Sequence, residues 1–288
     1  MTVYLNGQFL PISEAKISVL DRGFIFGDGV YEVIPVYSHR AFRLDEHLRR
    51  LQHSLDSIKL PNPHSDAAWT LLLNELIARN AQEGRNQDQY LYLHITRGVA
   101  KRDHAFPNPP VAPTVFVMSN PLTTPPAALL ASGISAITAP DNRWLRCDIK
   151  AISLLPNVLL RQMAIDAGCA ETIMIRDDEF MTEGAASNIF VVKNGTLLAP
   201  PKDNLMLPGI TYDVVLELAA ANGIPHQVRK VLASEVFNAD ELLLTSSTKE
   251  VLAITQLDGK PVGTGKPGAM FAKLHELYQN FKRDVMRK

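Results

Sequence analysis

The chain has 288 residues, enough for one large domain or two smaller ones with a sizeable core. Hydrophobic residues make up 46% and charged residues 20%, as in an ordinary globular protein, and the net charge of −1 provides no basic field for nucleic acid. The N-terminus lacks the pattern of a signal peptide, and no stretch approaches the roughly 18 apolar residues of a membrane span. Two cysteines, Cys147 and Cys169, are too few for a disulfide framework or a structural zinc site. We therefore expect a cytoplasmic protein with no metal, no nucleic-acid partner and no membrane partner.

The first elements are a hairpin and a strand. Residues 3–9 predict a hairpin with Asn6-Gly7 at the turn. Residues 23–34 approach an apolar strand through three glycines, whose spacing fits neither phosphate-loop nor dinucleotide-binding motifs. Tyr31 and Glu32 stand at the start of that strand and suggest a polar cavity there.

Two helices follow. Asp45 is expected as the N-cap of the first, whose apolar positions are Leu48, Leu51, Leu55 and Ile58. On a helical wheel Arg50 borders this apolar stripe, whereas Arg49 points to solvent. The second helix is predicted from residue 65 to about residue 82, ending near Gly84.

A loop with two cationic side chains comes next. Residues 90–96 predict a strand that runs into a loop over residues 97–107. Arg102 and His104 in this loop could bind a carboxylate together, since Arg offers a planar fork and a protonated His a second donor. Ordinary surface charges are the alternative.

A boundary between two domains is predicted after the next strand, residues 113–118. Residues 119–126 are rich in proline and threonine and lack helical periodicity. We expect an N-terminal α/β domain over 1–118, a linker over 119–130 and a C-terminal domain over 131–288.

One lysine stands out in residues 143–153. With a period of two, Trp144, Arg146, Asp148 and Lys150 lie on one side of a predicted strand, and the residues between them lie on the other. A lysine among apolar neighbours and beside another cation is favoured as the neutral amine, which is a nucleophile. The alternative is a solvated strand face that carries charges.

The rest of the chain supplies a carboxylate and two candidate anion sites. Glu183 stands in a predicted loop of small residues between apolar strands, an unusual place for an unpaired carboxylate. Residues 209–211 precede a predicted helix over 212–221, and residues 246–248 follow a predicted strand over 241–245. Both places suit a phosphate, although an ordinary cap or turn is the alternative. The other elements expected here are a helix from Pro156 to Gly168, strands over 171–176 and 188–192, and a C-terminal helix from about Met270.

A nucleophilic lysine, a carboxylate for a pyridinium nitrogen and several anion sites are the parts that a pyridoxal 5'-phosphate enzyme needs. Five motifs carry a resemblance to one family. They are Phe-Gly-Asp-Gly-Val-Tyr-Glu (26–32), Glu-His-Leu-Arg-Arg-Leu (46–51), Asp-Ile-Lys (148–150), Thr-Glu-Gly-Ala-Ala-Ser-Asn-Ile-Phe (182–190) and Leu-Pro-Gly-Ile-Thr (207–211). Their order resembles that of class IV (fold type IV) pyridoxal-phosphate aminotransferases along nearly the whole chain.

The resemblance implies an α+β fold of two domains. The smaller N-terminal domain would be α/β, the larger C-terminal domain would have a β-barrel-like core, and the cofactor would lie at the domain interface. By the same resemblance Lys150 would form the Schiff base with the cofactor and shuttle the proton, and Glu183 would pair with the pyridine nitrogen. The expected phosphate contacts are Arg50, Ile210, Thr211 and Ser247.

Within the family, Arg102-Asp-His104 together with Tyr31 resembles the α-carboxylate trap of D-amino-acid aminotransferases. This implies transfer of an amino group from a D-amino acid such as D-alanine to a 2-oxo acid such as 2-oxoglutarate. In that subfamily the loop reaches into the partner subunit's site, which implies a homodimer. Tyr212, Ala185 and Ala186 depart from the family's usual residues and leave the side-chain preference open.

Two kinds of alternative remain. On the same fold, the chain could be a branched-chain L-amino-acid aminotransferase or an (R)-amine transaminase. In a different class, it could be a binding or scaffolding protein that has lost the cofactor.

Overall fold

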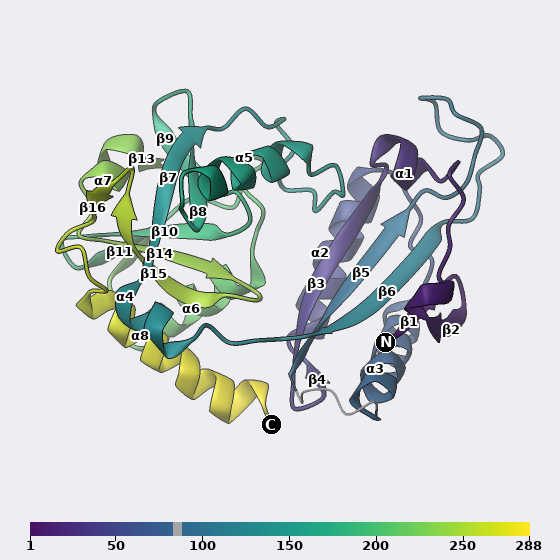
Figure 1. The fold of residues 1–288 in the computed structure, drawn as a ribbon, viewed down its shortest axis with the longest axis horizontal. Coiled ribbons are helices and arrows are strands. Elements are labelled where there is room, and N and C mark those ends of the chain that lie inside the picture. The colour runs from purple at the N-terminus through teal and green to yellow at the C-terminus, as the bar shows by residue number, and fades with distance from the viewer. Residues whose placement is uncertain (83–87) are drawn as a thin grey trace. The chain divides into compact units, whose positions relative to one another are not determined.

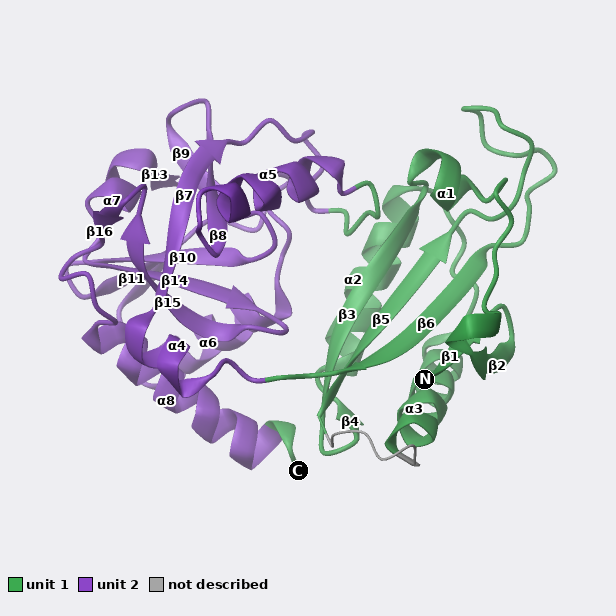
Figure 2. Ribbon diagram, in the orientation of Figure 1, with its two compact units in different colours: residues 1–123, 149–153, 286–288 green, residues 124–148, 154–285 purple. Residues whose placement is uncertain are grey.

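The computed structural model describes residues 1–82 and 88–288, so the helix end expected near Gly84 lies outside the described residues. The chain divides into two compact units (Figure 2). Unit 1 comprises Met1–Thr123, Ile149–Ser153 and Met286–Lys288, and unit 2 comprises Thr124–Asp148 and Leu154–Val285. Lys150 therefore belongs to unit 1. None of the described helices combines the length and the apolar character that crossing a membrane requires.

Unit 1 is built on an antiparallel sheet, which within the described residues has six strands in the order β2-β1-β6-β5-β3-β4 (Figure 1). The strands are β1 (Thr2–Leu5), β2 (Gln8–Pro11), β3 (Gly29–Tyr37), β4 (Arg40–Ala41), β5 (Gln89–Thr96) and β6 (Thr114–Pro121). The helices are η1 (Ile12–Glu14), α1 (Arg22–Phe26), α2 (Leu44–Ser57) and α3 (Asp66–Gln82).

The alternation of side chains along β3 and β5 separates a core face from a second face. Every other residue, such as Val30, Ile34 and Leu93, packs with α2 and α3 in one hydrophobic core. On the other face, Tyr31 and His94, which oppose each other in the β3–β5 register, are half-buried. The sheet thus presents a polar and aromatic surface at the start of β3.

Unit 2 contains a mixed sheet, in which β7 runs parallel to both β8 and β15. The strands are β7 (Ile134–Pro140), β8 (Glu171–Arg176), β9 (Phe180–Gly184), β10 (Asn188–Lys193), β11 (Thr196–Ala199), β12 (His226–Val228), β13 (Val231–Leu232), β14 (Glu241–Ser246), β15 (Glu250–Leu257) and β16 (Lys260–Pro261). The helices are α4 (Ala127–Ser132), α5 (Leu155–Asp166), α6 (Ile210–Ala221), α7 (Ala233–Phe237), α8 (Ala269–Phe281) and the π-helical turn η2 (Lys282–Met286). The sheet curls into a half-barrel around an apolar core.

The predicted strand over residues 143–153 is wrong. These residues form turns and bends, and a single bridge between Val30 and Ala151 is the only β-pairing there within the described chain. Their burial does not alternate: Trp144 and Leu145 are both exposed, whereas Ile149 and Lys150 are both buried. Two of the charged residues that suggested a strand face form a local ion pair instead: Arg146 pairs with Asp148 at 3.0 Å.

Two smaller corrections concern Asp45 and Glu183. The N-cap of α2 is Arg43, and Asp45 lies within the first helical turn, where its charge favours the helix dipole. Glu183 lies in strand β9, not in a loop, because Met181 to Gly184 are buried and pair with β8. Around the expected linker, β6 continues to Pro121 and α4 begins at Ala127.

Candidate active site

Lys150 is fixed in unit 1 by its backbone. Its N–H donates to the Ser54 hydroxyl of α2 at 3.1 Å, and its carbonyl accepts from the Tyr31 N–H of β3 at 3.0 Å. The side chain is 9% exposed, and Nζ lies 4.1 Å from the centroid of the Tyr31 ring. Lys150 and Tyr31, both expected site residues, therefore meet.

Arg50 is held by the carboxylate of Glu32, which is not among the expected site residues. Its Nε and an Nη donate to Glu32 at 2.8 and 2.7 Å, and Nδ1 of His47 lies 2.8 Å from the same carboxylate. Burial alone would raise the pKa of Glu32, but the charge and hydrogen bonds of Arg50 and His47 lower it. Burial also lowers the pKa of His47, although Glu32 opposes the change. Arg50 thus borders the buried face of α2, as predicted, while Arg49 is exposed.

The expected carboxylate-binding pair lies apart from this group. Arg102 and His104 are exposed, and both flank Phe26: the His104 ring lies 5.3 Å and the Arg102 Cζ 5.4 Å from the Phe26 ring centroid. Among the described residues, no hydrogen bond or ring contact joins either side chain to Tyr31 or Lys150. Within one chain, the pair is brought to Phe26 and not to the lysine.

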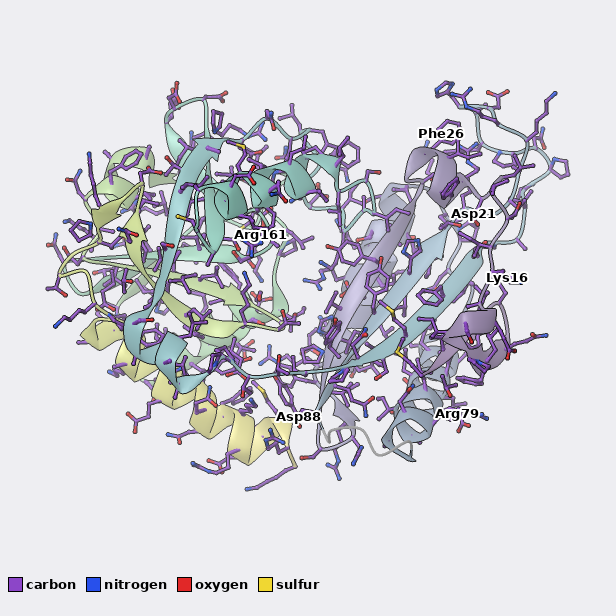
Figure 3. The ribbon with its side chains drawn as sticks, viewed as in Figure 1. Lys16, Asp21, Phe26, Arg79, Asp88 and Arg161 are labelled. Atoms are coloured by element: carbon purple, nitrogen blue, oxygen red, sulfur yellow. The ribbon has the colours of Figure 1, made fainter. Side chains whose placement is uncertain are left out.

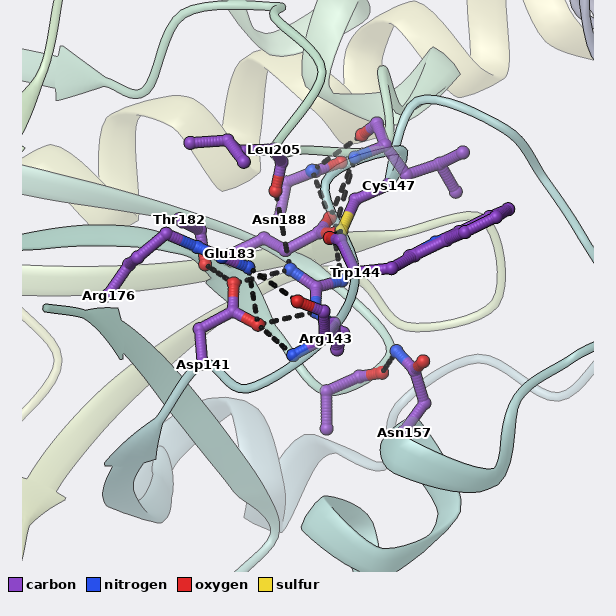
Figure 4. Close-up of polar contacts among 12 residues, drawn as sticks. Asp141, Arg143, Trp144, Cys147, Asn157, Arg176, Thr182, Glu183, Asn188 and Leu205 are labelled. Atoms are coloured by element: carbon purple, nitrogen blue, oxygen red, sulfur yellow. Dashed lines mark hydrogen bonds and ion pairs between the residues drawn. The ribbon is translucent and has the colours of Figure 1, made fainter. Parts of the chain in front are cut away.

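Glu183 in unit 2 is a buried acceptor surrounded by donors (Figure 4). Arg143 donates to its Oε1 at 2.6 Å, Asn188 donates to Oε2 at 3.3 Å, and the Leu207 N–H donates to Oε1 at 3.2 Å. Burial raises the pKa of the Glu183 carboxyl to about 7, and the charge and hydrogen bond of Arg143 keep the rise from being larger. The ionised form is therefore available at neutral pH.

Arg143 links Glu183 to a second carboxylate, Asp141. Its Nε donates to Asp141 Oδ1 and an Nη donates to Oδ2, both at 2.9 Å. Thr182 and Arg176 also contact Asp141, at 2.7 and 3.2 Å. Burial alone would raise the pKa of Asp141, but the hydrogen bonds and charge of Arg143 lower it to about 2. The pair of carboxylates keeps Arg143 charged although burial disfavours its cation.

Asn188 lies next to both segments that carry candidate phosphate contacts in unit 2, the start of α6 and the end of β14. Gly209 is the N-cap of α6, which begins at Ile210 and Thr211, and no side chain caps this end. A Cβ on Gly209 would lie 2.1 Å from the Asn188 amide oxygen, so the chains approach as closely as glycine allows. Asn188 also pairs in register with Thr245, two residues before Ser247 in the turn after β14.

Tyr212, which departs from the family pattern, is a core residue. Its side chain is fully buried, its hydroxyl donates to the Pro200 carbonyl at 2.7 Å, and its ring stacks on Phe190 with centroids 5.0 Å apart. Its place in α6 therefore concerns packing of the helix and not contact with a ligand.

Four residues with clear parts in these networks had no assigned role: Glu32, Asp141, Arg143 and Asn188. Glu32 and Asn188 lie inside quoted motifs, one residue after Tyr31 and five after Glu183, which was the available signal. Arg143 meets Glu183 forty residues away, and no local pattern indicates such a contact.

The comparisons with known proteins agree with one another. Residues 29–257 match the family described as amino-transferase class IV. A D-alanine aminotransferase of Bacillus licheniformis is 40% identical over 280 residues, covering 97% of this chain and 96% of that protein. A D-alanine aminotransferase of Staphylococcus epidermidis is 37% identical, covering 97% of each chain. The structure of a T.th. branched-chain amino acid aminotransferase with pyridoxamine 5'-phosphate has a TM-score of 0.89 and 25% identity, covering 100% of this chain and 95% of that one.

These matches confirm the resemblance, the α+β fold and the prediction of an enzyme that transfers amino groups. They span both units, and the family match contains four of the five motifs in full and residues 29–32 of the first. The family and the cofactor named in the neighbouring structure imply pyridoxal phosphate chemistry. The chain belongs to the class IV aminotransferases.

Proposed function

We propose that this chain is a pyridoxal 5'-phosphate-dependent aminotransferase that transfers the amino group of a D-amino acid, most simply D-alanine, to a 2-oxo acid such as 2-oxoglutarate. The observation that carries the proposal is the buried Lys150, whose Nζ faces the Tyr31 ring at 4.1 Å. The relatives named D-alanine aminotransferase, which match nearly the full chain, support the choice of substrate. They do not favour the branched-chain or (R)-amine alternatives.

The donor set of each unit fits this cofactor. Unit 1 offers the Lys150 amine and the Arg50 guanidinium. Unit 2 offers the Glu183 carboxylate, whose shell of donors leaves it able to accept from a ring N–H, and the uncapped start of α6 with the Ser247 hydroxyl. Free helix N–H groups, a hydroxyl and a guanidinium are the groups that proteins use for phosphate. When bound, the cofactor supplies an electron sink for the bond broken at the substrate α-carbon.

Lys150 moves the proton in this scheme. Its amine must be neutral to accept a proton from the α-carbon. Its backbone bonds to α2 and β3 hold Cα in place, so that the side chain moves about a fixed point. Tyr31 covers one side of Nζ and excludes water there.

Glu183 and Arg50 act by charge. The ionised Glu183 holds a proton on the ring nitrogen, and Arg143 keeps Glu183 in place by a 2.6 Å ion pair. Arg50 keeps its orientation through Glu32, so that it does not need to be ordered when phosphate binds. Arg102 and His104 supply the donors for the substrate α-carboxylate, and Tyr31 supplies a hydroxyl.

We also propose a homodimer in the cytoplasm. The exposed Arg102 and His104 flank Phe26 and make no contact with Lys150 in the described chain, which favours a role in the partner's site. Both cysteines are free thiols, which suits a reducing compartment. The two domains and their linker, over 1–118, 119–130 and 131–288, remain our proposed division.

The test is a half-reaction panel on the purified holoenzyme. D-Alanine, L-leucine and (R)-1-phenylethylamine are each added alone, and the visible absorption of the bound cofactor is followed. We expect the absorption to change with D-alanine, whereas a change with L-leucine and with neither other amine would contradict the proposal. Lys150→Ala should lose turnover by at least about 10²- to 10⁴-fold, the usual contribution of proton transfer by a positioned side chain. The exposed Lys16→Ala serves as the matched control and should behave as wild type.

A further inference from the structure

A short helix and a loop of unit 1 are joined by buried charges. Helix α1 is anchored at its N-cap, where the Asp21 carboxylate accepts from the Gly23 N–H at 2.8 Å and from the Thr114 hydroxyl at 2.6 Å. Its first residue, Arg22, is only 4% exposed. In Figure 1, α1 lies beside the loop that follows β5. A buried arginine at this place needs several acceptors.

The acceptors are carbonyls of the loop that carries Arg102 and His104. One Nη of Arg22 donates to the Asp103 carbonyl at 2.6 Å and to the Ala105 carbonyl at 3.2 Å. The other Nη lies 3.4 Å from the His104 carbonyl. These carbonyls lie on both sides of His104 and directly follow Arg102, so the guanidinium fixes the backbone from which the His104 side chain leaves and the backbone next to Arg102.

Asp28 fixes Arg22 in turn. Its Oδ2 accepts from Nε of Arg22 and from Nε of Arg97, both at 2.8 Å, and its Oδ1 accepts from Arg97 at 3.0 Å. Burial alone would raise the pKa of Asp28, but the two guanidinium groups lower it. We refer to Arg22, Asp28 and Arg97 as the Asp28 cluster.

The cluster holds both ends of the loop. Arg97 begins the loop, donates to the Ile58 carbonyl at 2.7 Å, and stacks over the Phe106 ring at 3.7 Å near the other end. Between these ends Phe26, labelled on α1 in Figure 3, contacts Arg22 as well as the Arg102 and His104 side chains. The two ends and the centre of the loop are thus held by the Asp28 cluster and by Phe26.

From this geometry we infer that Arg22 is a positioning residue that sets the affinity for the substrate α-carboxylate, by fixing the loop that presents Arg102 and His104. The inference rests on the proposed role of those two side chains. A loop held in the binding conformation does not lose conformational entropy when the carboxylate arrives. Without Arg22 the loop samples other conformations, and binding weakens by the fraction of competent loops.

The experiment compares Arg22→Gln and Arg22→Lys with wild-type holoenzyme. Lysine keeps the charge and can reach Asp28, but a single ammonium cannot span the carbonyls of residues 103–105 as the planar fork does. The first readout is the rate of tryptic cleavage after Lys101 and Arg102, resolved by mass spectrometry. Cleavage follows the population of the open loop, so loss of one charge-assisted hydrogen bond raises it about tenfold. The second readout is the KM for D-alanine, which should rise about tenfold while kcat stays within about twofold.

The control is Arg79→Gln, which removes an exposed pair with Glu75 on α3 and should change neither readout. If Arg22→Gln does not fold, Arg22→Lys decides. The inference is wrong if trypsin cleaves the variants at the wild-type rate. It is also wrong if cleavage is faster but the KM for D-alanine is unchanged. If wild-type enzyme ignores D-alanine, the proposed function fails, while the cleavage rates still report whether Arg22 holds the loop.

Discussion

At the scale of single residues, the pKa values of two buried carboxylates, Glu32 and Glu183, are shifted in opposite directions. Glu32 is bound by Arg50 and His47 of α2 and its pKa is lowered, whereas Glu183 shares Arg143 with Asp141 and its pKa is raised to about 7. Burial is the main cause of the raised pKa of Glu183, and the charge of Asp141, which also binds Arg143, adds to it. Glu32 is therefore ionised at neutral pH, whereas Glu183 can gain or lose a proton there.

Glu32→Gln should lower the free energy of unfolding by about 3 kcal/mol at pH 7, since it leaves the buried Arg50 without its anion. The folded-state pKa of Glu32 lies below its ordinary value of about 4.5, so its stabilisation is present above that pH and is lost as the pH falls. Urea unfolding between pH 7 and pH 3 should therefore show a shallower acid dependence in the variant. Glu75→Gln, at an exposed pair, should cost less than about 1 kcal/mol. A variant whose acid dependence parallels that of wild type would contradict this account.

Glu183→Gln keeps the shape of the side chain but cannot hold a proton on the ring nitrogen by charge. We expect kcat with D-alanine to fall by about 10²- to 10³-fold, the usual effect of removing a preorganised electrostatic contact. The pH titration of the bound cofactor's visible absorption should also move. The control is Glu179→Gln at an exposed site. Unchanged kcat and an unchanged titration would remove Glu183 from the mechanism.

At the scale of elements, the start of α6 depends on Asn188 of β10. Gly209→Ala would place a methyl 2.1 Å from the Asn188 amide oxygen and push that amide away from Glu183 and the Leu207 carbonyl. We expect the Kd for cofactor to rise about tenfold, the effect of one lost hydrogen bond, in titrations of the apoprotein. In an Asn188→Ala background the same substitution should have little further effect, because the two changes act through one contact. Additive effects would show that Gly209 acts independently.

The elements that the sequence predicts well are those whose own residues decide them. Strand β8 matches its predicted bounds because all six of its residues are buried and turn residues follow. The place of Arg50 on α2 follows from helical periodicity alone. The segment around Lys150 could not be predicted, because its charges alternate as a strand's would, and its actual hydrogen bonds go to Ser54 and Tyr31, far away in the sequence.

The site shows the same division. Motifs predict Lys150 and Glu183 as site residues, whereas no motif predicts the ion pairs that hold Glu183 and Arg50. The Arg143–Glu183 pair joins a bend to a strand, and the Glu32–Arg50 pair joins a strand to a helix. Such pairs depend on tertiary packing, and no spacing rule along one element indicates them.

At the scale of the whole molecule, the placement of Arg102 and His104 predicts a shared site. Lys150→Ala and the double variant Arg102→Ala/His104→Ala are co-expressed with different tags, and the mixed species is purified. With random pairing, half of the dimers are mixed. If each loop completes the partner's site, one of the two sites in a mixed dimer combines an intact lysine with an intact loop. About a quarter of the wild-type activity should therefore be present before the mixed dimer is purified. Sedimentation should give twice the chain mass.

Each variant expressed alone gives the background for this test. If mixing restores no activity, the loop and the lysine of one chain work together, and the proposed exchange between subunits is wrong. A sedimentation mass of one chain would also exclude it. The matched control mixes Lys150→Ala with Arg79→Gln. The site that contains the lysine of the Arg79→Gln chain stays intact whether the loop comes from the same chain or from the partner.

The division of the chain also has a consequence for how the protein is made. Unit 1 includes Ile149–Ser153, which carries Lys150, and the last residues, where Arg287 donates to the Asp88 carboxylate at 2.8 Å. Synthesis runs from the N-terminus, and domains generally fold as units in that order. The sheet of unit 1 can therefore begin to form before Lys150 is synthesised, and the ion pair between Arg287 and Asp88 forms later. The proposed nucleophile therefore joins a sheet whose strands precede it in the chain, and Arg287 adds its contact to the same unit afterwards.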